Sequence, residues 1–279
     1  DFMAFKEKNG VPLKTERGDR VFPVSDKSSD VINAFKTALK HKHCQVRLNT
    51  KITDLYVEDS AVKGIVLDNG ETRNFDAVIL ATGGKSYPST GSDGNFFQIL
   101  KKWGHQVTAL APGLVPINTK EDWPRELQGL ALKNVVLTLY KKTPKGQKKV
   151  RSMLGEMLFT HFGLSGPLVL SLSSDMIGNI KDFSLELDLK PALSTEQLDA
   201  RIQRDFLKYQ NKDFGNALGD LLPSKMIPVM VALSGIDPAT KVNQITREQR
   251  QKLVACFKQL KIGIAGLRDF NEAIITVGG

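Results

Sequence analysis

The sequence predicts an α/β fold in which an antiparallel β module and a helical module follow an α/β region. Residues 76–81 (DAVILA) form a nearly continuous β-prone apolar run that ends in a glycine-rich loop. Several segments between 130 and 189 alternate polar and apolar residues, as half-buried antiparallel strands do. Helical periodicity then dominates from 194 to 260, before a last apolar run at 272–277.

Length and composition exclude several classes of protein. At roughly 150 residues per domain, the 279 residues suffice for two domains, or for one domain with a large insertion. Hydrophobic residues make up 41% of the chain and charged residues 25%, which excludes a disordered or collagen-like protein. No apolar run approaches the roughly 18 residues of a membrane helix, so we expect no membrane partner.

Cysteines and histidines predict neither a disulfide framework nor a metal site. Cys44 and Cys256 have no partner at a disulfide or metal-motif spacing, and two cysteines fit a reducing cytoplasm. His41 and His43 precede Cys44 in the string HKHC. Two histidines two positions apart on a helix do not share a face, so we expect no bound metal.

The first region of the chain combines helices with hairpins. The pattern of residues 1–9 predicts a helix that Gly10 ends. Apolar side chains recur at helical spacing over 31–40, which predicts a second helix. Strands are expected at 44–48, 51–57, 61–67 and 71–75, with turns at 58–60 and at Asp68-Asn69-Gly70.

A buried strand and a glycine-rich loop follow. Runs such as 76–81 are typical of strands buried on both faces of a parallel sheet. The loop at 81–94 (ATGGKSYPSTGSDG) leads into a predicted helix at 94–103. Because glycine lets a ligand approach the backbone and free amides bind phosphate, this loop is a candidate phosphate site in a nucleotide-binding architecture. An ordinary surface loop is the alternative, since neither a Walker motif nor GxGxxG occurs in the chain.

The next region reads as antiparallel β structure, consistent with a small barrel. Its strands are predicted at 130–140, 155–160, 168–172 and 183–189. Four helical segments follow, at 194–208, 216–222, 224–233 and 246–260, and the first of them begins with a capping box of Ser194 and Gln197. Short strands at 261–266 and 272–277 end the pattern.

The charge balance leaves a non-enzymatic alternative open. Lys and Arg number 39 against 30 Asp and Glu, a net charge of +9, and such an excess favours anionic partners. Six basic residues and no acid lie in 141–151 (KKTPKGQKKVR), which we interpret as a solvated hairpin tip. No aromatic side chains interleave with it for base stacking, so nucleic acid is not the expected partner. The alternative is a basic β/helical module that contacts RNA or protein without catalysis.

A second motif, 155–167 (GEMLFTHFGLSGP), offers the one catalytic candidate among these residues. His161 could carry a proton near neutral pH. A structural β-turn held by glycines explains the same residues equally well, so both interpretations stay open.

Five segments together resemble the BaiN-type bacterial FAD-dependent oxidoreductases, the family that includes aminoacetone oxidase. They are 14–24 (KTERGDRVFPV), 81–94, 127–134 (LQGLALKN), 155–167 and 271–279 (NEAIITVGG). The resemblance runs through essentially the whole chain. It implies an incomplete FAD-binding portion, Rossmann-like and of the two-dinucleotide-binding-domain type, with inserted antiparallel β and helical modules. The family's N-terminal GxGxxG and C-terminal flavin segment have no counterpart here.

The resemblance also implies a subdivision of the chain and a set of site residues. The parts are a partial FAD-binding domain (1–110), a β-rich inserted module (111–190), a helical inserted module (191–262) and a return to the FAD-binding domain (263–279). The implied cofactor residues are Ile52 beside adenine, Thr82, Gly83 and Gly84 beside the phosphates or adenosine, and Gly278 and Gly279 at the flavin. Tyr87, Thr90, Arg20, Pro23 and His161 are weaker candidates.

The function that the resemblance implies is electron transfer between a small-molecule substrate and NAD(P)H or dioxygen. FAD would be the cofactor of the complete protein, with NAD(P)H as a second candidate. The flavin would carry the redox chemistry, and the protein would orient the substrate. Flavin absorbance would separate this function from the RNA- or protein-binding alternative, which salt-dependent nucleic-acid binding would favour.

Overall fold

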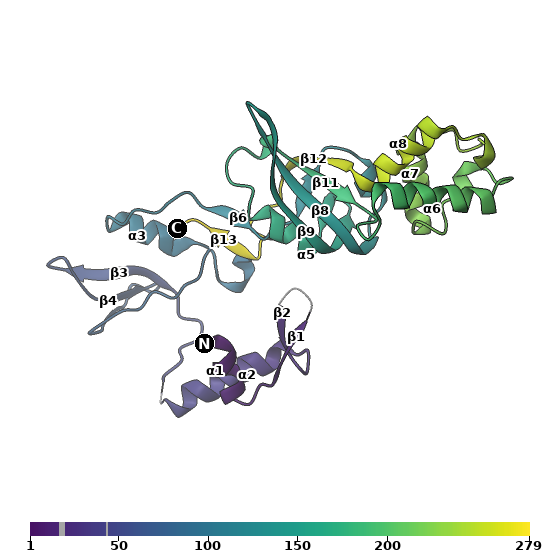
Figure 1. Cartoon of the computed structure of the whole chain (residues 1–279). Coiled ribbons are helices and arrows are strands. Elements are labelled where there is room, and N and C mark those ends of the chain that lie inside the picture. Colours follow the sequence, from purple (N-terminus) through teal and green to yellow (C-terminus); the bar gives the residue numbers. More distant parts are fainter. Residues whose placement is uncertain (17–19, 43) are drawn as a thin grey trace. The chain divides into compact units, whose positions relative to one another are not determined.

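The computed structural model describes residues 1–16, 20–42 and 44–279. The chain forms two compact units, Asp1–Leu80 and Ala81–Gly279, drawn in Figure 1. The mixed α/β character is confirmed. Every strand pair among the described residues is antiparallel, so the Rossmann-like part and the four-part subdivision stay predictions. His43 of the HKHC string lies outside the described residues.

The first unit contains the two predicted helices and a three-stranded antiparallel sheet of order β3-β4-β5. The Asp1 carboxylate accepts a hydrogen bond from the Met3 amide (2.9 Å) and caps the first helix, which Gly10 follows at φ +81°. Residues 44–48 are exposed and irregular, so the predicted strand there is wrong. The elements are α1 (Phe2–Lys8), β1 (Leu13–Glu16), β2 (Arg20–Pro23), α2 (Ser28–His41), β3 (Ile52–Glu58), β4 (Ala61–Leu67) and β5 (Thr72–Asn74).

Residues 76–81, predicted as a buried strand, are irregular and mostly exposed. The Ile79 side chain is 90% exposed. Backbone N–H and C=O groups form a strand only beside a second strand, and no described strand pairs with this segment. The prediction is therefore wrong in this structure, because β propensity alone does not supply a partner.

The second unit carries the larger core. Its elements are α3 (Asn95–Lys102), β6 (Ala111–Gly113), β7 (Ile117–Thr119), α4 (Trp123–Glu126), β8 (Ala131–Thr143), β9 (Gly146–Thr160), β10 (Gly163–Ser165), α5 (Pro167–Ser173), β11 (Phe183–Asp188), α6 (Thr195–Lys208), α7 (Ile227–Ser234), α8 (Arg247–Lys258), β12 (Leu260–Leu267) and β13 (Ile275–Val277). None of the helices in the described ranges is long and apolar enough to cross a membrane.

Six strands of this unit close into a barrel in the order β10-β7-β12-β11-β8-β9, which confirms the predicted small barrel. Closure leaves no free sheet edge. Inward residues alternate along each strand, and the interior is filled by fully buried aliphatic side chains. These include Leu137, Leu139, Leu185, Leu187, Ile262 and Ile264. Strand β12 follows the helical segments in the sequence. It pairs with β11 and with β7 and so closes the barrel.

Residues 168–172 form part of helix α5 rather than the predicted strand. Short apolar runs suit a buried strand or a buried helix equally well. Here Pro167 occupies the first helical turn after Gly166 at φ +92°, and proline at that position favours a helix. Leu168, Val169 and Leu172 are buried against the barrel core.

A helical module follows β11. The capping box of Ser194 and Gln197 is confirmed, and Thr246 and Gln249 form a second one at α8. Arg250 of α8 pairs with Asp199 of α6 (Nε···Oδ1 2.6 Å), which lowers the pKa of that carboxyl group. Asn216 ends a short 3-10 helix (Phe214–Asn216), and residues 217–222 form bends and turns rather than the predicted helix, consistent with Gly219 within them and Pro223 after them.

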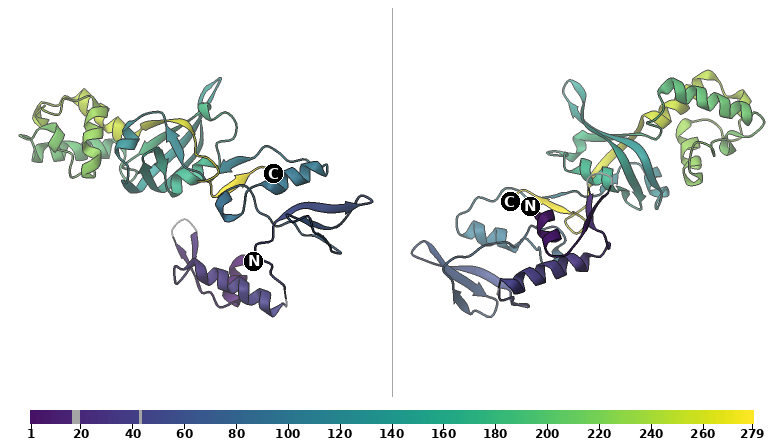
Figure 2. Two further views of the ribbon diagram at one scale, coloured as in Figure 1. Left: turned by 180° about the vertical axis from the view of Figure 1, so that it is seen from behind. Right: turned by 60° about the horizontal axis from the view of Figure 1, so that its bottom comes forward.

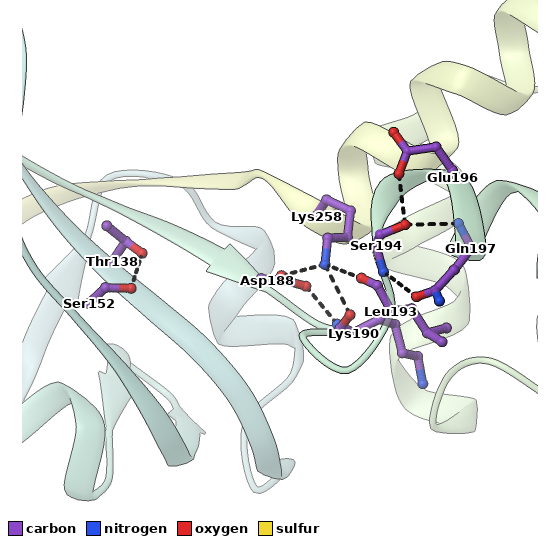
Figure 3. A network of polar contacts seen from close by, with 9 residues as sticks. All are labelled: Thr138, Ser152, Asp188, Lys190, Leu193, Ser194, Glu196, Gln197 and Lys258. Atoms are coloured by element: carbon purple, nitrogen blue, oxygen red, sulfur yellow. Dashed lines mark hydrogen bonds and ion pairs between the residues drawn. The ribbon is translucent and has the colours of Figure 1, made fainter.

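A lysine joins the barrel to the helical module, as Figure 3 shows. Lys258, at the end of α8, forms an ion pair with Asp188 at the end of β11 (Nζ···Oδ2 2.6 Å). The same ammonium group donates to the carbonyl oxygens of Lys190 (3.0 Å) and Leu193 (2.7 Å). All three donors of the ammonium group therefore have partners in the connection between β11 and α6.

Candidate functional site

The glycine-rich loop is fastened to β13 by one hydroxyl group. Thr276 Oγ1 accepts hydrogen bonds from the amides of Lys85 (2.7 Å) and Ser86 (3.1 Å). Ser86 Oγ lies 2.9 Å from the same oxygen. Strand β13 is in turn paired with β6 in a two-stranded sheet. Segments some 190 positions apart in the sequence are thereby brought to one place.

Close packing against Thr276 explains why residue 84 is a glycine. A Cβ atom at Gly84 would collide with the Thr276 side chain, so no other residue fits without a shift. Gly83 has φ +72°, a conformation that favours glycine. The amides of Thr82, Gly83 and Gly84 donate to no acceptor in the described part of the chain. Three consecutive free amides beside glycine can bind an anion such as a phosphate.

The far end of the loop packs on residues that precede β13. Tyr87, at φ +51°, donates its amide to the Phe270 carbonyl (3.0 Å). Thr90 Oγ1 donates to the Tyr87 carbonyl (2.7 Å) and closes a short 3-10 turn. The Lys85 ammonium lies 5.0 Å from the centre of the Phe270 ring. The side chain of Tyr87 is exposed, which leaves it accessible to a ligand.

The two C-terminal glycines lie in the same region. A Cβ atom at Gly278, which has φ +86°, would collide with the Ala109 carbonyl oxygen. Gly279 exchanges hydrogen bonds with Thr108, through its amide to Thr108 Oγ1 (3.0 Å) and through its carbonyl from the Thr108 amide (3.2 Å). Residues 81–90, 108–113 and 275–279 thus form one connected group, which we call the glycine-loop site.

Ile52, Arg20 and Pro23 belong to the first unit, Asp1–Leu80, and the glycine-loop site belongs to the second. Ile52 lies on β3 opposite Leu67. It lines a hollow of about 740 Å³ on one face of the sheet, together with Arg47 and Arg73. Arg20 and Pro23 are the two ends of β2. Their cofactor roles stay predictions.

His161 lies exposed in the turn between β9 and β10. Its ring makes an edge contact with Phe162 (4.9 Å between centroids), and the Arg268 guanidinium lies 4.5 Å from the Phe162 ring. Glu272 holds Arg268 through an ion pair (Nε···Oε1 2.6 Å). Phe270, which accepts from the Tyr87 amide, lies two positions after Arg268, so the segment 268–272 contacts both the His161 turn and the glycine-loop site.

Sequence reasoning missed Thr276, Thr108, Phe270 and Arg268. Thr276 is the polar residue within the apolar run EAIITV, and that interruption was the available signal. Thr108 contributes through its hydroxyl group and amide, Phe270 through its carbonyl and ring, and Arg268 through a ring contact and an ion pair. Their roles follow from where β12 and β13 return the chain, which no local pattern encodes.

Comparisons with known proteins point to one family. The family model described as "HI0933-like protein barrel and H2TH domain" matches residues 111–275, more than half of the chain. Its span contains the observed barrel strands and the helical module.

Three curated relatives carry the names of enzymes. The chain is 25% identical over 94% of its length to the 3-dehydro-bile acid delta(4,6)-reductase of Clostridium scindens, and it covers 63% of that protein. It is 26% identical over its whole length to the ribosomal RNA dihydrouridine synthase of Escherichia coli, of which it covers 66%. It is 23% identical to the ribosomal RNA dihydrouridine synthase of Haemophilus influenzae, and it covers 66% of that protein. The chain thus spans slightly less than two thirds of these relatives. On the family match, it belongs to the HI0933-like family.

Proposed function

We propose that this chain is the barrel-bearing part of an FAD-dependent oxidoreductase of the BaiN type. It would act in the cytoplasm and pass electrons between a substrate and NAD(P)H or dioxygen. The observation that carries the proposal is the glycine-loop site, where three free amides lie beside two close-packed backbone segments. The names of the relatives support it, because a reductase and an enzyme that makes dihydrouridine both carry out reductions.

Each residue of the glycine-loop site has a proposed role in holding the cofactor. The amides of Thr82, Gly83 and Gly84 bind the phosphates or adenosine half of FAD, and Thr276 fixes the loop that presents them. Gly278 and Gly279 lead the chain toward the flavin. Bound flavin supplies the hydride or electron transfer. Lys85 adds positive charge beside the phosphates, which lowers the free energy of the bound anion.

Further residues have proposed roles away from the amides. Tyr87 and Thr90 border the cofactor from the 3-10 turn. Ile52 meets adenine through its backbone. His161 carries a proton to or from the substrate, and its exposed position in the turn between β9 and β10 permits contact with a substrate. Arg268, held by Glu272, orients an anionic group of the substrate.

Two substrate classes follow from the relatives. A small unsaturated molecule is one, by analogy with the bile acid reductase. Uridine in RNA is the other, by analogy with the dihydrouridine synthases. The basic β8–β9 hairpin of the barrel favours the second.

The proposed function is tested by the colour and redox response of the full-length protein. We expect it to purify with flavin absorbance, to release FAD on denaturation, and to bleach when NAD(P)H is added without oxygen. A colourless protein that takes up no FAD on reconstitution would contradict the proposal. If the protein contains flavin but NAD(P)H does not reduce it, the electron donor is a different molecule and that part of the proposal is wrong.

A further inference from the structure

The β8–β9 hairpin extends past its neighbours in the barrel. Strand β11 pairs with β8 only between Val136 and Lys141, and β10 pairs with β9 only from Leu158 onward. Beyond Lys141 the two strands therefore pair only with each other, up to Thr143 opposite Gly146. Figures 1 and 2 show this part of the hairpin projecting from the barrel. All residues from 146 to 151 are exposed.

The outer part of the hairpin carries charge of one sign. No acidic residue occurs from 127 to 155, whereas seven basic residues do. They are Lys133, Lys141, Lys142, Lys145, Lys148, Lys149 and Arg151. Segments with a single sign of charge create a potential that attracts ligands of opposite charge.

None of the six lysines in this set has a carboxylate partner in the described part of the chain, whereas Arg151 pairs with Asp175 (3.2 Å). Four of them are exposed and lie close to the turn, and we call them the tip lysines: Lys142, Lys145, Lys148 and Lys149. Three lysines of the helical module differ in this respect: Lys208, Lys241 and Lys252 form ion pairs with Asp220, Asp213 and Glu248. The tip lysines thus form a local group of like charge that no carboxylate of the described chain pairs with.

The strand register sets one pair of like charges opposite each other. Lys141 faces Lys148 across the hairpin, and Lys149 faces Tyr140. Like charges directly opposite on a sheet destabilise it. A bound polyanion would remove this repulsion and would release the counterions that the lysines hold in its absence.

We propose that the tip lysines bind the phosphate backbone of RNA. The inference rests on the proposed function, because it names RNA as the substrate delivered to the same oxidoreductase. The hairpin tip offers Pro144 and Val150 as its only apolar side chains, too few for insertion into a lipid surface. It offers no aromatic ring between 141 and 151, so bases are not stacked and binding is independent of sequence.

This proposal replaces the expectation that nucleic acid is not a partner. That expectation relied on the lack of interleaved aromatic side chains, which excludes base stacking. Phosphate contacts need only cations on an accessible element, and they supply essentially all of sequence-independent affinity. The projecting hairpin meets that requirement.

The test compares two quadruple variants of the full-length protein. In the tip variant, Lys142, Lys145, Lys148 and Lys149 become glutamine. In the control, Lys208, Lys212, Lys241 and Lys252 of the helical module become glutamine, which removes the same charge. Binding of a structured ribosomal RNA fragment is measured by fluorescence anisotropy between 50 and 200 mM salt. No flavin or turnover is needed for the readout.

We expect the tip variant to bind RNA about tenfold or more weakly at 0.1 M salt, with a salt slope smaller by about three. The control should keep the slope of the unchanged protein. Equal losses in both variants would show a general charge effect and overturn the proposal. Unchanged RNA binding by the tip variant would also overturn the proposal. So would a finding that the tip lysines bind phosphatidylserine vesicles and not RNA.

Failure of this inference and failure of the proposed function have different signatures. If the protein contains flavin but binds no RNA, or binds RNA without the tip lysines, the proposed function stands and only the RNA inference is contradicted. A protein that binds RNA through the hairpin but contains no flavin would support the RNA-binding surface and contradict the proposed oxidoreductase function.

Discussion

Replacing Gly84 with valine is expected to reduce the FAD content of the full-length protein by about tenfold or more. A Cβ atom at this position would collide with the Thr276 side chain. Overpacking of this kind costs about 1–3 kcal/mol, and each 1.4 kcal/mol is about a factor of ten in binding. The loop would separate from β13, and the free amides of residues 82–84 would lose their fixed position.

The control is Gly266→Ala in β12, where the added Cβ would meet open space. We expect it to retain flavin. Because Gly84→Val could unfold the region, Thr276→Val and Thr276→Ser form a second pair. Valine removes the oxygen that accepts the Lys85 and Ser86 amides, whereas serine keeps it. Normal FAD content in both Gly84→Val and Thr276→Val would show that the glycine-loop site does not hold the cofactor.

Replacing Lys258 with methionine should detach the helical module from the barrel. The side chains of Lys258 and Asp188 are 15% and 20% exposed, so their ion pair is largely shielded from water. Methionine would leave the Asp188 carboxylate without its ammonium partner and the Leu193 carbonyl oxygen without a donor, whereas the Lys190 carbonyl would keep the Leu193 amide (3.1 Å). Breaking a fully buried pair costs about 3–5 kcal/mol. With partial exposure we expect the loss here to be about 2 kcal/mol.

Lys252→Met on the same helix is the matched control. Its ion pair with Glu248 is exposed, at 63% and 78% for the two side chains, so it should change stability by less than about 0.5 kcal/mol. Hydrogen exchange of the α6 and α8 amides reads out the helical module separately from the rest of the chain. If Lys258→Met and Lys252→Met accelerate exchange equally, Lys258 does not fasten the module.

Local sequence patterns predicted the elements that are determined by neighbouring residues or by alternation along a strand. Alternation identified the barrel strands β8 and β11, and the spacing of Ser194 and Gln197 located the start of α6. The order of strands in the barrel was not accessible in this way. Strand β12 joins β7 and β11 across the whole helical module, and only tertiary pairing determines that.

The wrong predictions share a physical cause. Residues 76–81 have strand propensity, but no strand in the described part of the chain pairs with them. Residues 168–172 are apolar enough for either structure, and the Gly166-Pro167 pair before them decided for a helix. At the glycine-loop site, Gly83 and Gly84 were found from the sequence, whereas the Thr276 hydroxyl that fixes their loop was not, because it comes from β13.

The central claim is that residues 82–86 and 276–279 together hold FAD. Hydrogen exchange of the full-length protein, with and without bound FAD, tests it most directly, because the amides of residues 82–84 have no acceptor in the described chain. We expect bound FAD to slow exchange of residues 82–86 by about tenfold or more, with smaller protection at 276–279. Flavin-loaded protein in which these amides exchange as fast as in the flavin-free form would contradict the account.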